Sequence, residues 1–97
     1  MTKDIFLLGS TGSIGETTLK VIKKDKSNFN IKLLSTNKNI EKIFKQAIQF
    51  GVKKVVVFDK KSYLHSLKKF REKKIKIFLT IKEALKNNKK KSFLTVN

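Results

Sequence analysis

The chain has 97 residues, of which 24 are Lys or Arg and 7 are Asp or Glu, so its formal net charge is +17 at pH 7. It contains no Cys, which excludes disulfides and thiolate metal sites. No apolar run approaches the roughly 20 residues that a membrane-spanning helix needs, and the amino-terminal residues lack the shape of a signal peptide. We therefore expect one domain, or a piece of one, in the cytoplasm and with no membrane partner.

The positive charge raises the alternative of a basic nucleic-acid-binding module. Three observations count against it. The chain has 23 Lys but one Arg, whereas recognition of bases and phosphates favours the planar guanidinium of Arg. The lysines are spread from Lys3 to Lys91 without forming a basic arm, and the enrichment in Lys, Asn, Ile and Phe is the bias of an AT-rich genome. We therefore expect no specific nucleic-acid partner.

The first half of the chain is predicted to alternate strand and helix. Residues 4–8 are a short apolar run that suits a strand buried on both faces, as in a parallel sheet. Residues 15–24 carry apolar side chains at helical spacing, residues 29–35 form a second strand, and residues 39–50 form the clearest helix. Gly51 is well placed to end that helix in a left-handed turn.

The second half continues the alternation. Residues 54–58 are a strongly β-branched third strand. Ser62 is expected to cap a helix that runs to about Glu72, and residues 75–79 form a fourth strand. A capping box of Thr80 and Glu83 then opens a short helix.

A solvated turn over residues 87–91 and a fifth strand over residues 92–96 complete the pattern. Strict alternation predicts an α/β fold, a Rossmann-like three-layer sandwich with a mostly parallel five-stranded sheet and right-handed crossovers. Because no helix follows the fifth strand, we expect the sheet to be incomplete at its C-terminus.

Three of the four glycines fall within seven residues, between the first strand and the first helix. In an α/β sheet, ligands bind beyond the carboxyl ends of the strands, where a helix N-terminus offers unpaired N–H groups to an anion. We expect Gly9 to permit a tight turn, Gly12 to let the backbone approach a phosphate, and Gly15 to let the helix pack close to the strand. The hydroxyl groups between them are suited to phosphate oxygens: Ser10, Thr11 and Ser13.

The spacing of these glycines is G-x-x-G-x-x-G, which differs from both the standard dinucleotide fingerprint and the P-loop. A Gly/Ser turn that binds no ligand is the alternative interpretation. The strand before the motif and the helix after it favour a site for the diphosphate of a dinucleotide.

The end of the second strand indicates which dinucleotide is bound. NAD-binding folds usually place Asp or Glu there to hold the ribose 2′-hydroxyl. This chain has no carboxylate at that point, and the predicted cofactor-binding residues are Thr36, Asn37, Lys38 and Asn39. A lysine attracts a 2′-phosphate, so we expect NADPH and interpret residues 1–97 as a partial N-terminal NADP-binding domain.

The stretches "FLLGSTGSIGETTLKVI", "LLSTNKNIEKIFKQAIQF" and "VVVFDKKS" resemble 1-deoxy-D-xylulose 5-phosphate reductoisomerase. The resemblance implies NADPH-dependent conversion of 1-deoxy-D-xylulose 5-phosphate to 2-C-methyl-D-erythritol 4-phosphate in the non-mevalonate isoprenoid pathway. It places the cofactor's diphosphate at Thr11, Gly12, Ser13 and Ile14. The 2′-phosphate falls on residues 37–39, where the family often has Gly in place of Asn37.

The resemblance also implies what this chain lacks. The Mg²⁺ or Mn²⁺ ligands and the substrate phosphate site of the family lie downstream, so we expect a metal only in the full-length enzyme, a homodimer, and no activity from this fragment alone. The seven acidic residues are scattered and His65 stands alone, so we assign no catalytic or metal residue. Another NADP-dependent reductase of the semialdehyde dehydrogenase type, which needs a downstream catalytic Cys, remains an alternative.

Overall fold

A computed structural model describes residues 3–86 and 93–95. Within them, strands and helices alternate along the chain as predicted, with bounds that differ from the expected ones by a few residues. The elements are β1 (Lys3–Leu8), α1 (Ser13–Lys24), the short 3₁₀ turn η1 (Lys26–Asn28), β2 (Phe29–Thr36), α2 (Ile40–Phe50), β3 (Lys54–Val57), α3 (Lys60–Glu72), β4 (Lys76–Phe78), α4 (Ile81–Ala84) and β5 (Phe93–Thr95). The turn expected at residues 87–91 lies outside the described residues.

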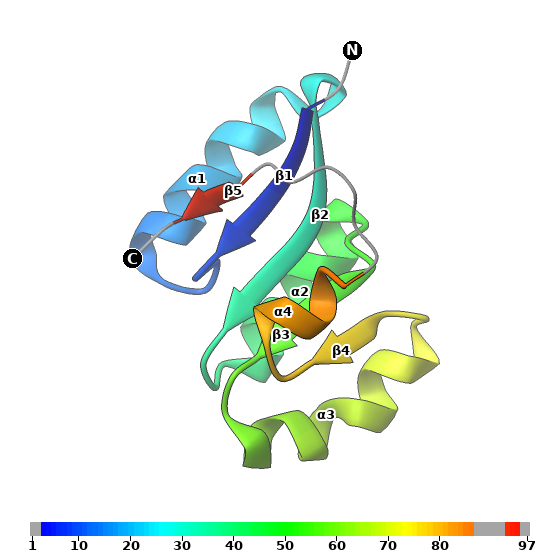
Figure 1. Ribbon diagram of the computed structural model, residues 1–97. Helices are drawn as coiled ribbons and strands as arrows, with labels where there is room; N and C mark the ends of the chain where they lie inside the picture. The colour runs from blue at the N-terminus through cyan, green and yellow to red at the C-terminus, as the bar shows by residue number, and fades with distance from the viewer. Residues whose placement is uncertain (1–2, 87–92, 96–97) are drawn as a thin grey trace.

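The strands form one sheet in the order β4-β3-β2-β1-β5, and every pair of neighbours is parallel, which confirms the predicted five-stranded parallel sheet. All the arrowheads in Figure 1 therefore point the same way. From β1 the chain moves outward through β2 and β3 to β4, and β5 then lies on the other side of β1. This change of direction is a topological switch point, where α/β sheets usually bind their ligands.

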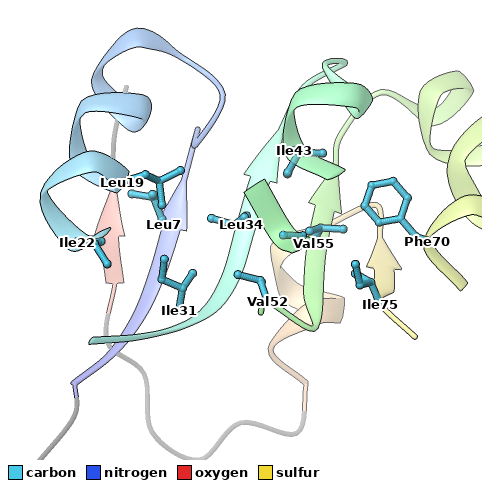
Figure 2. Close-up of a cluster of buried hydrophobic side chains, with 11 residues drawn as sticks. Leu7, Leu19, Ile22, Ile31, Leu34, Ile43, Val52, Val55, Phe70 and Ile75 are labelled. Carbon is cyan, nitrogen blue, oxygen red and sulfur yellow. The ribbon is translucent and has the colours of Figure 1, made fainter. Parts of the chain in front are cut away.

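Neighbouring residues of the central strands point to opposite faces of the sheet. Leu34 and Val55 belong to one apolar cluster, which also contains residues of α1, α2 and α3 and is drawn in Figure 2. Leu33 and Val56 belong to a second cluster, which also contains Ala84 at the end of α4 and the residue after it. Both faces of the sheet are therefore covered, by three helices on one side and by α4 on the other (Figure 1), as the three-layer prediction requires.

An irregularity in β2 was not predicted. Ile5 pairs with Ile31, but Phe6 pairs with Leu33, so Lys32 is an extra residue in the ladder. This β-bulge lets Ile31 and Leu34 join the same apolar cluster although an odd number of positions separates them. Lys32 itself stays exposed.

Side-chain caps begin three of the helices. Asn39 accepts a hydrogen bond from Lys42 N–H at α2, and Thr80 accepts one from Glu83 N–H at α4. The cap of α3 corrects the prediction, since Asp59 takes the place expected of Ser62. The Asp59 carboxylate accepts hydrogen bonds from both the N–H and the hydroxyl of Ser62, at 3.0 and 2.7 Å.

The end of α2 is as predicted, with Gly51 in the left-handed conformation at φ 66°. None of the helices in the described ranges combines the length and apolar character needed to cross a membrane.

Two glycines are required by the backbone where β1 turns into α1. Gly9 has φ 75°, a conformation that side chains disfavour. A Cβ on Gly15 would lie 2.4 Å from the Gly9 carbonyl oxygen and 2.7 Å from two Ser10 backbone atoms. A side chain at Gly15 would therefore push α1 away from the loop.

We expect Gly15→Ala to lower the free energy of unfolding by about 1–3 kcal/mol, because the added methyl group meets backbone atoms that cannot turn aside. Gly12→Ala is the matched control, since a Cβ there would lie 3.7 Å from the Gly9 carbonyl oxygen, an ordinary contact. Urea unfolding of the two variants and the unmodified chain measures the difference. Equal stability of the two variants would contradict the close approach at Gly15.

A second prediction concerns the α3 cap. The hydrogen bonds from Ser62, helped by the charges of Lys38 and Lys61, lower the pKa of Asp59. A lowered pKa in the folded chain means that the cap stabilises the fold above the ordinary Asp pKa of about 3.9 and loses that effect as the pH falls through the lowered value.

We therefore expect Asp59→Ala to melt at a lower temperature than the unmodified chain at pH 7, and the difference to shrink below about pH 4. Asp59→Asn keeps a capping acceptor that does not titrate, so most of the stability at pH 7 should remain. Thermal unfolding followed by circular dichroism across pH 3–7 tests both variants. A difference for Asp59→Ala that is as large at pH 3 as at pH 7 would rule out the titrating cap.

Candidate functional site

The glycine-rich loop lies at the carboxyl edge of the sheet and is bonded to the end of β2. Ser35 makes two of the connections between them. Its hydroxyl accepts a hydrogen bond from Gly9 N–H at 2.8 Å, and its carbonyl accepts one from Ser10 N–H at 3.0 Å. The loop after β1 and the loop after β2 therefore form one continuous rim at the switch point.

The Ser10 hydroxyl, which the sequence suggested as a phosphate donor, is bonded within the protein. The Ser10 side chain is fully buried, and its hydroxyl donates to the side-chain oxygen of Gln46 at 2.8 Å. The Gln46 side-chain amide in turn donates to the Ser10 carbonyl at 3.0 Å. The Ser10 hydroxyl donates its proton to a protein acceptor, so this residue shapes the loop instead of facing a ligand.

The next part of the loop is open to solvent. Gly12 and Ser13 are exposed, and Ile14 is 57% exposed. Gly12 is the N-cap residue of α1 and makes no side-chain cap. Among the described residues, none accepts a hydrogen bond from the N–H of Thr11, Ser13 or Ile14. These groups, together with the positive end of the α1 dipole, suit an anion.

Gly12 differs from the other glycines of the loop because the chain itself does not require it. Its φ is −77°, which any residue adopts, and a Cβ there would make only an ordinary contact at 3.7 Å. The fold itself requires a glycine at Gly9 and at Gly15, but it does not require one at Gly12. The missing side chain leaves open space beside the free N–H groups, so the loop fits a bound diphosphate.

The end of β2 supplies the second half of the site. Thr36 is buried, and its hydroxyl lies 2.6 Å from that of Thr11, which ties the two loops together. Asn37, Lys38 and Asn39 follow and are exposed. The structure thus brings the two predicted groups of residues to one edge of the sheet, where Lys38 is exposed to solvent.

Two residues of this region were missed by the sequence reasoning. Asp59 reaches the rim from the end of β3, and its N–H donates to the Asn37 carbonyl at 3.0 Å. It lies close enough to Lys38 for that charge to help lower its pKa, after the larger effect of Ser62. Gln46 lies in the middle of α2. The available signal for Gln46 was one polar residue within an apolar helix face.

The described residues offer no basis for metal chemistry in this chain. Among them, no group of three or more His, Cys, Asp or Glu side chains is placed to hold a metal ion. His65 is exposed on α3. The divalent metal expected of the full-length enzyme therefore has no set of ligands among these residues.

Comparison with known proteins identifies relatives of this chain. The family model of 1-deoxy-D-xylulose 5-phosphate reductoisomerase matches residues 5–95. The reductoisomerase of Pelagibacter ubique is 49% identical over 76 residues, which cover 78% of this chain and 20% of that protein. The one from Clostridium tetani is 44% identical over 62 residues, covering 64% of this chain and 16% of that protein. The chain therefore spans about a fifth of the length of these relatives or less.

Solved structures of the same enzyme share the fold. The reductoisomerase of Zymomonas mobilis in complex with NADPH has 25% identity and a TM-score of 0.73, covering 80% of this chain and 21% of that one. A DOX-P reductoisomerase in complex with magnesium has 26% identity and a TM-score of 0.74, covering 88% and 21%. Because the family model matches nearly all of the sequence and the relatives agree, the chain belongs to the 1-deoxy-D-xylulose 5-phosphate reductoisomerase family.

Proposed function

We propose that this chain is the NADPH-binding part of a 1-deoxy-D-xylulose 5-phosphate reductoisomerase. Residues 11–14 hold the cofactor's diphosphate and residues 37–39 hold the 2′-phosphate of its adenosine. The observation that carries this proposal is the open N-terminus of α1 beside Gly12, where free N–H groups face solvent at the switch point of the sheet. The Zymomonas mobilis relative, which was solved with NADPH, supports it.

Each residue has a separate task in this proposal. The N–H groups of Thr11, Ser13 and Ile14 donate to diphosphate oxygens, while Gly12 keeps the approach clear. Lys38 meets the 2′-phosphate as a cation. Thr36 and Ser10 do not touch the cofactor but hold these groups in place, because both are buried and bonded within the rim.

The complete reaction belongs to the longer protein. When bound, NADPH supplies the hydride that reduces the isomerised sugar phosphate. The substrate and divalent-metal residues are proposed to lie in the part of the relatives that this chain does not match, so residues 1–97 form a partial cofactor domain. The cytoplasmic location, the homodimer and the lack of a specific nucleic-acid partner remain expectations of the same proposal.

We expect Gly12→Ala to weaken NADPH binding about tenfold or more, because its methyl group occupies the space left for the diphosphate. The same variant should unfold at the same urea concentration as the unmodified chain, since the fold accommodates a Cβ there. Isothermal titration calorimetry of the 97-residue chain with NADPH measures the affinity. Unchanged affinity would remove the diphosphate from this loop.

We also expect Lys38→Ala to weaken NADPH binding about tenfold while leaving NADH binding unchanged, because NADH lacks the 2′-phosphate. The expected loss is near the low end for a charge-assisted hydrogen bond, since Lys38 is exposed.

Lys53→Ala is the matched control for Lys38→Ala. Lys53 is also an exposed lysine, but it precedes β3 at the opposite edge of the sheet. The control removes the same charge from the molecule without touching the rim. Equal losses in the two variants would indicate general attraction by the net charge of +17 and would contradict a local contact.

A further inference from the structure

Gln46 is a polar side chain buried within the helical layer. It is 8% exposed and lies on α2, between the apolar neighbours Ile43 and Ala47 of the core. Burial of an amide is costly unless its polar atoms find partners. Both ends of this amide are satisfied by a single residue, Ser10, which is 36 positions away.

The two hydrogen bonds form a closed pair. The Ser10 hydroxyl donates to the Gln46 oxygen at 2.8 Å, and the Gln46 nitrogen donates to the Ser10 carbonyl at 3.0 Å. The pair needs a donor and an acceptor at the tip of one side chain, which an amide provides. A carboxylate of the same shape could accept the first bond, but it could not donate the second.

Ser10 is thereby held from two directions. Its N–H is bonded to the Ser35 carbonyl at the end of β2, and its hydroxyl and carbonyl are bonded to Gln46 on α2. The next residue along the chain, Thr11, carries the first of the free N–H groups of the loop. A fixed Ser10 therefore sets where those groups point.

We propose that Gln46 is a positioning residue for the cofactor's diphosphate. It acts through Ser10 to hold the loop of residues 9–15 in the conformation that aims its N–H groups outward, and it does not touch the cofactor itself. This inference rests on the proposed function, because it assumes that the loop binds the diphosphate. Gln46 lies outside both of the predicted binding segments, so the inference gives helix α2 a role in the site.

The test compares Gln46→Met with Gln49→Met in the 97-residue chain. Gln49 lies on the same helix but is exposed, and it makes no side-chain hydrogen bond to the described residues. Two ligands distinguish the diphosphate half of the site from the 2′-phosphate half. Their affinities are measured by calorimetry and by NMR titration. NADPH contacts both halves, whereas adenosine 2′-monophosphate carries the 2′-phosphate and has no diphosphate.

We expect Gln46→Met to weaken NADPH binding about tenfold, as is typical when an outer partner of a binding group is lost. Its affinity for adenosine 2′-monophosphate should stay within about twofold of the unmodified chain, since one factor of two is well under 1 kcal/mol. Amide hydrogen exchange at residues 11–14 should become faster. Gln49→Met should leave both affinities unchanged.

Other outcomes would overturn the inference. Equal weakening of both probes by Gln46→Met would indicate general destabilisation, and unchanged NADPH affinity would remove the role in positioning. If the unmodified chain binds adenosine 2′-monophosphate but not NADPH, the proposed diphosphate site fails instead.

A second variant covers the case in which Gln46→Met does not fold. Ser10→Ala removes the hydroxyl's bond to Gln46 and its longer contact with the Ser35 carbonyl at 3.4 Å, and leaves the Gln46 bond to the Ser10 carbonyl. The loss of one such bond should weaken NADPH binding about threefold and leave adenosine 2′-monophosphate unaffected. Unchanged NADPH affinity in this variant would equally contradict the inference.

Discussion

The hydrogen bonds made by Ser35 are the connection on which the candidate site depends. Through its hydroxyl and its carbonyl, this residue at the end of β2 fixes Gly9 and Ser10 at the end of β1. The close pairing of β1 with β2 makes the connection possible, and the parallel direction of the two strands brings both loops to the same edge. Together with the contact between the Thr36 and Thr11 hydroxyls, it joins the groups proposed for the diphosphate and the 2′-phosphate into one site.

Much of this arrangement could be predicted because it follows from local chemistry. Runs of apolar and β-branched residues predicted the strands, and Gly9 and Gly51 were predicted from their positions after a strand and a helix. The position of Lys38 after the second strand was also local information. In each case the relevant signal lies within a few residues of the feature it predicts.

The rest depends on partners that are distant in sequence. Nothing near Ser10 in the sequence indicates that its hydroxyl meets Gln46 on α2, so this partner was not foreseen when the hydroxyl was expected to face a phosphate. The bulge at Lys32 depends on the pairing of two strands. The use of Asp59 instead of Ser62 as the α3 cap depends on where β3 ends. The strand was predicted to end one residue later than it does.

The bond between Ser10 and Gln46 spans 36 positions and has a consequence for the order of assembly. The loop can reach its final shape only after α2 has docked on the sheet, because Gln46 lies on α2. The entropy cost of closing this long stretch of chain comes before the stabilising contact can form. Occupancy by a dinucleotide would then stabilise β1, β2 and α2 as one cooperative unit, by about 2.7 kcal/mol at a ligand concentration one hundred times the dissociation constant. A dinucleotide bound at the proposed site would therefore hold together the segment of the chain that surrounds its own binding loop.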